Sequence, residues 1–187
     1  MKPLRYFLTV SLISLTTLAL AQHDGQKPVA QSEAQKSFDT LKTLAGSWQG
    51  RITVDPPQED MKDTVGQITM RVTSRGHALV HEMQEAGTPL DATKYDHPVT
   101  MFYLDADRLT LVHYCDAGNR PRMTGTLSPD GKKVEFDFAD LSGRDDYGHM
   151  YHAVFTIIDA NHHTEDWTYM MPGNKAMHAH MDLVKSN

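Results

Sequence analysis

The chain has 187 residues, of which 40% are hydrophobic and 22% charged, a composition typical of a globular protein rather than a disordered one. Its 18 Lys and Arg against 24 Asp and Glu give a net charge of −6 with no basic stripe, so we expect no nucleic-acid partner. The single cysteine, Cys115, excludes an intramolecular disulfide framework and a cysteine-rich metal site.

The first 21 residues have the pattern of a signal peptide. Lys2 and Arg5 precede an uncharged stretch over 6–20, which ends at the small-x-small sequence Ala19-Leu20-Ala21. This stretch is shorter than the about 20 residues that a membrane span needs, so a membrane anchor is the weaker alternative. We predict a signal peptide over residues 1–21, a flexible lead-in over 22–35 and a periplasmic or secreted protein without a membrane span once the signal is removed.

One short helix is predicted before the strands begin. Phe38, Leu41 and Leu44 lie three residues apart, the spacing of one apolar helix face. The pattern places the start of the helix near Ser32. It makes Gly46 the expected C-cap glycine.

From Trp48 onward, apolar and polar residues alternate, as in strands with one buried face. The alternation is clean over Trp48–Val54, Ile68–Val72 and Val134–Phe138. Less regular runs separated by short turn sequences follow at His77–Glu85, Val99–Leu104, Leu109–Cys115, Arg122–Leu127, His149–Ile158, Thr164–Met170 and Lys175–Val184. We therefore predict about ten strands, each antiparallel to the next.

This arrangement predicts an all-β fold, a ten-stranded antiparallel up-and-down barrel that forms a single domain over residues 36–187. No second helix could cover a flat sheet of this size, so the sheet must bury one face by curling, and closure removes its edges. A β-sandwich is the alternative. It needs long crossovers, for which only residues 55–65 and 86–98 are long enough.

Four motifs carry a resemblance to a known family. They are Phe38-Asp39-x-Leu41-Lys42-x-Leu44-x-Gly46-x-Trp48-x-Gly50, His113-Tyr114-Cys115-x-x-Gly118-Asn119-x-Pro121-Arg122-Met123, Gly148-His149-Met150 and Asp159-x-x-His162-His163-Thr164-Glu165-x-Trp167. Together they resemble an uncharacterised family of exported bacterial lipocalin-like (calycin-type) barrels that is distantly similar to nitrobindin. The resemblance implies an internal cavity and a helix that plugs the barrel base above a Gly-x-Trp tryptophan. In the nitrobindin branch a late-strand histidine binds haem iron, and the late-strand histidines of this chain are His178 and His180.

Apolar strand faces that also carry polar groups indicate a ligand pocket. His113 shares a strand face with Leu109, Leu111 and Cys115, and Arg122 needs a carboxylate partner, either Glu82 or Glu165 or one on a ligand. The predicted ligand-binding residues are His113, Cys115, Arg122, Met123, His149, Glu165 and Trp167.

Other histidines have simpler interpretations. His178, His180 and Asp182 share one strand face and could chelate a metal, but the opposite face is apolar, so we expect these three to face solvent. His162 and His163 adjoin a turn and are expected at the surface. His77 and His81 are expected on one strand face of mixed polarity.

The leading functional hypothesis is a barrel that binds a small apolar or amphipathic molecule in its cavity. The alternatives are a haem or metal protein that uses His149 and His152 or His178 and His180, and a cell-envelope structural or stress protein without a ligand. Catalysis by Cys115 and His113 lacks a third orienting group and a glycine elbow, and no P-loop, HExxH or dinucleotide motif is present. We therefore expect no enzyme activity and no cofactor.

Overall fold

The computed structural model describes residues 30–186, so the predicted signal peptide and lead-in residues 22–29 lie outside the described residues. Helix α1 (Glu33–Lys42) begins where the sequence predicts, because the Ser32 hydroxyl caps it by accepting a hydrogen bond from the Gln35 amide at 3.1 Å. Residues 33–35 of the expected lead-in are therefore helical. The expected C-cap at Gly46 is wrong. The helix ends at Lys42 with Thr43 as its C-cap, and Gly46 instead opens the first strand with a φ of 148°.

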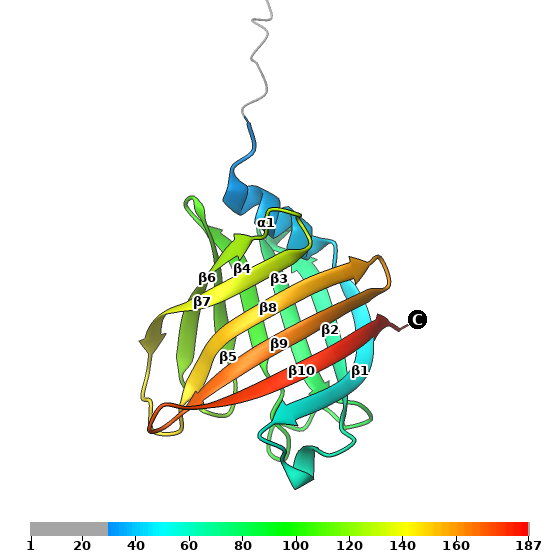
Figure 1. Cartoon of the computed structure of the whole chain (residues 1–187), viewed down its shortest axis with the longest axis vertical. Coiled ribbons are helices and arrows are strands. Elements are labelled where there is room, and N and C mark those ends of the chain that lie inside the picture. Colours follow the sequence, from blue (N-terminus) through cyan, green and yellow to red (C-terminus); the bar gives the residue numbers. More distant parts are fainter. Residues whose placement is uncertain (1–29, 187) are drawn as a thin grey trace, which may run out of the picture. The chain divides into compact units, whose positions relative to one another are not determined.

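Ten strands follow the helix, with short 3₁₀ turns at η1 (Glu59–Met61) and η2 (Ser74–Gly76). They are β1 (Gly46–Asp55), β2 (Val65–Thr73), β3 (Ala78–Glu85), β4 (Val99–Asp105), β5 (Arg108–Tyr114), β6 (Arg120–Leu127), β7 (Lys133–Ser142), β8 (His149–Asp159), β9 (His162–Met171) and β10 (Lys175–Lys185). Each strand is antiparallel to the next, and β1 pairs with β10, so the sheet closes into a barrel (Figure 1). The predicted fold class is confirmed, and the sandwich alternative is excluded.

The two long connections that a sandwich would need join neighbouring strands of the barrel. Residues 56–64 link β1 to β2 through η1, and residues 86–98 link β3 to β4. Both lie at the end of the barrel away from α1 (Figure 1). Within residues 30–186, none of the helices has the length and apolar character needed to cross a bilayer.

The end of the barrel near α1 is filled with side chains. Phe38 and Leu41 of the helix are buried against the barrel. Trp48 is fully buried below them, and its indole Nε1 donates a 2.7 Å hydrogen bond to the carbonyl oxygen of Leu44. This is the helix plug and tryptophan that the resemblance implies. Deeper in the barrel the rings of Phe102, Phe136 and Phe155 pack with centroids 5.4–6.0 Å apart. This half of the interior is therefore solid core.

Candidate functional site: a cavity at the open end of the barrel

The opposite end of the barrel contains a cavity of about 420 Å³. Its wall combines side chains from β1, β3, β5, β8, β9 and β10 with residues from η1 and the end loops. The lining residues are Ile52, Asp60, Met61, Thr64, Met83, Gln84, Glu85, Asp96, Pro98, His113, Cys115, Asp116, Met150, Tyr169 and Met177. Most of the exposed cavity wall is apolar, with a few polar groups, the usual make-up of a small-molecule site.

His113, one of the predicted ligand-binding residues, borders this cavity from β5. Only 2% of the residue is exposed, and its Nδ1 lies 2.8 Å from the hydroxyl oxygen of Thr100 on β4. Its Nε2 has no hydrogen-bond partner within residues 30–186. Burial, together with the nearby His81, lowers the pKa of His113 to about 3, so the ring is neutral at pH 7. A neutral imidazole with one free nitrogen can bond a polar group in the cavity.

Cys115, also predicted, lies just beyond the end of β5 and lines the same cavity. The thiol is half-buried, and burial raises its pKa, with the charges of Asp96 and Asp116 acting in the same direction. A thiol with a raised pKa is a poor nucleophile. Cys115 therefore contributes a polarisable surface to the wall.

Glu165 and Trp167, two further predicted residues, lie deeper in the barrel on β9. The carboxylate of Glu165 is fully buried and accepts a 2.9 Å hydrogen bond from the indole Nε1 of Trp167. His81 Nε2 lies 3.2 and 3.0 Å from its two oxygens, and His163 Nε2 lies 3.1 Å from Oε1. We call Glu165, His81, His163 and Trp167 the buried carboxylate cluster.

The buried carboxylate cluster holds Glu165 in its charged form. Burial alone would raise the pKa of Glu165, but the charge and hydrogen bonds of His81 and His163 outweigh it and hold the pKa below its usual range. The indole ring of Trp167 lies between His81 and His113, with ring centroids 5.9 and 5.6 Å away. The cluster therefore supports the floor of the cavity without lining it.

The other three predicted residues do not line the cavity. Met123 is fully buried and pairs in register with Leu111 and Phe138. His149 lies at the start of β8, where its Nδ1 is 2.7 Å from Asp145 and its ring is 4.7 Å from the ring of Phe138.

Arg122 has a partner that the sequence analysis did not consider. Its guanidinium Nε donates a 3.0 Å hydrogen bond to Asp140, the residue directly opposite on β7, and its Nη1 lies 3.6 Å from Asp105. Neither expected partner, Glu82 or Glu165, pairs with it. The arginine is therefore occupied by carboxylates of the protein, away from the cavity.

The late-strand histidines face outward, as predicted. His178 and His180 on β10 are exposed, and they bond Thr168 and Asp166 on the outer face of β9 at 3.0 and 2.6 Å. Asp182 on the same face bonds His162 at 2.6 Å. None of these four side chains borders the cavity.

Two expectations for the remaining histidines are wrong. His163 is fully buried in the buried carboxylate cluster, because it alternates with Glu165 and Trp167 along the inward face of β9. His77 precedes β3 and is exposed, whereas His81 lies in the core.

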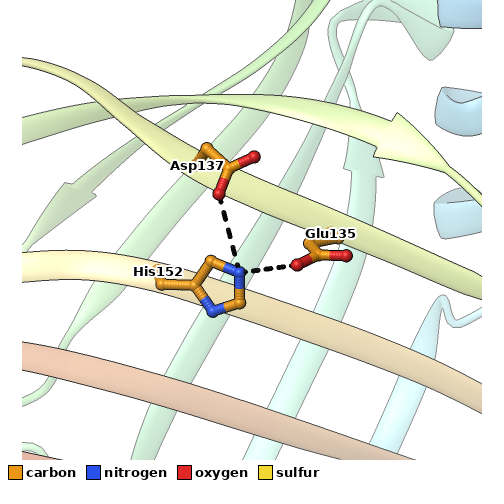
Figure 2. Close-up of side chains that lie close together, drawn as sticks. All are labelled: Glu135, Asp137 and His152. Atoms are coloured by element: carbon orange, nitrogen blue, oxygen red, sulfur yellow. Dashed lines mark hydrogen bonds and ion pairs between the residues drawn. The ribbon is translucent and has the colours of Figure 1, made fainter.

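One group of side chains on the outer face of the barrel has the composition of a metal site. Glu135, Asp137 and His152 offer ligand atoms within 4.8 Å of one another, and Figure 2 shows both carboxylates of β7 directed at the His152 ring on β8. The same nitrogen, Nε2, lies 2.9 Å from Glu135 and 3.7 Å from Asp137. The carboxylates are exposed, and the histidine nitrogen that a metal would need already bonds them. The arrangement is that of a surface ion-pair group.

Comparison with known proteins identifies the fold. Neither a protein-family model nor a curated protein matches the sequence. Among solved structures, Rv2717c from M. tuberculosis aligns with a TM-score of 0.60 at 15% identity, covering 81% of this chain and 98% of that protein. A protein of unknown function from the DUF3598 family of Nostoc punctiforme aligns with a TM-score of 0.25 at 6% identity, over 80% of this chain and 99% of that one. The chain forms a closed ten-stranded antiparallel barrel and shares its fold with Rv2717c.

Proposed function

We propose that the protein binds a small apolar or amphipathic molecule in the cavity at the open end of the barrel. The observation that carries the proposal is that side chains fill one end of the barrel and leave a cavity at the other. The α1 end is filled by aromatic side chains, whereas the other end leaves about 420 Å³ bordered by Ile52, Met83, Met150 and Met177. Methionine side chains adapt to ligands of different shape, and burying apolar ligand surface contributes about 25 cal/mol per Å².

His113 supports the same proposal. A buried polar atom without a partner costs roughly 1–3 kcal/mol, and a ligand or a water that bonds Nε2 removes that cost. The predicted residues that carry ligand binding are therefore His113 and Cys115 directly, with Glu165 and Trp167 as positioning residues beneath them.

The test is calorimetric titration with 4-butylbenzyl alcohol, a neutral apolar probe small enough for the cavity. We expect binding to the unaltered protein, and a loss of at least about tenfold in affinity in Met177→Trp, where the larger side chain fills the cavity. Met171→Trp is the matched control, because Met171 is exposed near the end of β9. Circular dichroism and thermal unfolding of both variants exclude misfolding. Failure of this alcohol and of its ammonium and carboxylate analogues to bind would overturn the proposal.

A haem alternative is distinguished by titrating the protein with hemin. The resemblance to the nitrobindin branch suggests a late-strand histidine as the iron ligand, but His178 and His180 already bond Thr168 and Asp166 on the outer face. A shifted Soret band that disappears in His113→Ala and persists in His178→Ala would favour haem in the cavity over an apolar ligand.

We also propose that the protein is exported, and that it belongs with the exported lipocalin-like barrels that its motifs resemble. The support for export is the charged start, apolar stretch and Ala19-Leu20-Ala21 sequence of the first 21 residues. The mass of the protein isolated from its host tests this. We expect a chain that begins at Gln22, and a mass that includes residues 1–21 would contradict it.

A further inference from the structure

The mouth of the cavity carries negative charge only. Four carboxylates belong to its lining, those of Asp60, Glu85, Asp96 and Asp116, and the lining contains no lysine or arginine. None of the four forms an ion pair with another residue within 30–186. Lys94, in the groove beside Asp96, lies 3.8 Å from Asp91. The carboxylates at the mouth therefore have no ion-pair partner among the described residues.

The negative charges at the mouth lie close enough to influence one another. Asp96 and Asp116 both line the cavity, and the Asp96 carboxyl lies near enough to Asp116 for both the backbone N–H and the charge of Asp116 to act on its pKa. Partial burial raises the pKa of Asp96, and the charge of Asp116 raises it further. On the cavity wall, burial raises the pKa of Tyr169 to about 12, and negative groups that include Asp116 and Asp96 add to the shift. A cation at this point would relieve the repulsion.

A second observation, the unpaired nitrogen of His113, points to a polar ligand group in the same cavity. His113, which is 2% exposed, borders the cavity and has its Nε2 unpaired among the described residues. In the tautomer that donates Nδ1–H to Thr100, Nε2 has a lone pair for a ligand N–H, and in the other tautomer Nε2–H is a donor. The cavity thus combines an unpaired imidazole nitrogen at its floor, methionines on its wall and carboxylates at its mouth.

We propose that the ligand is an amphipathic cation, a protonated amine on a compact apolar body. The apolar body packs against Met83, Met150 and Met177, and the positive charge lies within the field of Asp96 and Asp116. This inference rests on the proposed function and narrows it, because it assigns the sign of charge that the site selects. Anionic molecules such as fatty acids are disfavoured by the same carboxylates.

The test compares three probes that share one apolar body and differ in charge: 4-butylbenzylammonium, 4-butylbenzyl alcohol and 4-butylbenzoate. Calorimetric titration of the whole protein at pH 7 and low salt should give an ammonium Kd about tenfold below that of the alcohol, with the carboxylate weakest. The preference should decrease at high salt, since part of it arises from screened charges.

Two variants localise the effect. Asp116→Asn should reduce the ratio of ammonium to alcohol affinity several-fold, because losing the carboxylate weakens binding of the ammonium more than binding of the neutral alcohol. Asp107→Asn removes the same charge from the exposed β4–β5 turn near α1 and should leave the ratio unchanged.

The outcomes separate this inference from the proposed function. Equal affinity for ammonium and alcohol would overturn the cation preference and leave the apolar site intact. An equal effect of Asp107→Asn and Asp116→Asn would also overturn it, because net charge and not the mouth would be responsible. If none of the three probes binds, the proposed function fails as well.

Discussion

His81 and Glu165 lie 84 residues apart in the chain and meet at the centre of the barrel, where one imidazole nitrogen lies 3.2 and 3.0 Å from both carboxylate oxygens. Their relative exposures are 1% and 0%, so water reaches neither partner. The contact joins β3 to β9 across the interior, between strands that do not pair in the sheet. Together with His163 and Trp167 it replaces the apolar layer that a solid barrel core would have at this level.

Glu165→Gln should destabilise the protein by about 3 kcal/mol, because the amide cannot accept hydrogen bonds from three donors and leaves buried polar groups unpaired. Urea unfolding followed by tryptophan fluorescence measures the loss. Glu82→Gln is the control, since Glu82 is the exposed neighbour of His81 on β3. An unchanged unfolding midpoint for Glu165→Gln would mean that the buried carboxylate cluster does not stabilise the fold.

The pH dependence of stability should contain a contribution from His113. The folded-state pKa of about 3 lies below the 6.5 that is usual for a solvent-exposed histidine, so near pH 6 and below the unfolded chain binds a proton that the folded protein excludes. Stability therefore falls as pH decreases below about 6.5, by about 2 kcal/mol between pH 7 and pH 5 from this residue. Glu165, with its lowered pKa, contributes stability that is lost only at more acidic pH.

The measurement is urea unfolding at pH 7 and pH 5 for three proteins. His113→Gln should lose this part of the pH dependence. His77→Gln should keep it, because His77 is exposed and has no hydrogen-bond partner among the described side chains. If the two variants respond to pH alike, His113 is not the group responsible.

The barrel could be predicted from the sequence because its evidence is local. Alternation along Trp48–Val54 and Val134–Phe138 specifies strands with one buried face, and short turns specify antiparallel neighbours. The pairing register is irregular between Arg122 and Met123 and between Met150 and His152. At these places side chains do not alternate regularly between the inner and outer face of the barrel, so the sequence alone does not show which face each one occupies. His149 and Arg122, both adjacent to such breaks, were the residues placed least well.

The site was predictable only in part because it depends on which strands meet across the barrel. The shared face of His113 and Cys115 follows from spacing along one strand. The contact of His81 with Glu165, and the clustering of Asp96 with Asp116 at the mouth, depend on the closed arrangement of strands from distant parts of the chain. The burial of His163 could have been predicted, because residues 163, 165 and 167 are two apart along one strand, so His163 lies on the same inward face as Glu165 and Trp167.

The surface group Glu135, Asp137 and His152 should behave as an ion-pair group and not as a metal centre. Zinc sites of structural type use four ligands, whereas here one histidine nitrogen already bonds the carboxylates. Calorimetric titration with Zn²⁺ at pH 7 should give no one-to-one binding tighter than about 10 μM. Tight binding that disappears in His152→Asn and persists in His162→Asn would contradict this interpretation.

Closure of the barrel should depend on Gly50, which lies in the pairing of β1 with β10 opposite Leu183. A Cβ added at this glycine would lie 1.7 Å from the carbonyl oxygen of Asp182, a backbone atom that cannot move without shifting β10. Gly50→Ala should therefore lower stability by about 3 kcal/mol, the upper range for overpacking a well-packed site. Thermal unfolding measures the effect, with Gln49→Ala on the exposed face of the same strand as the control. Because the β1–β10 seam also carries Ile52 beside the cavity, the 4-butylbenzyl alcohol Kd of Gly50→Ala should rise with the loss of stability. An unchanged melting temperature would mean that the two strands can separate at Gly50 without opening the barrel.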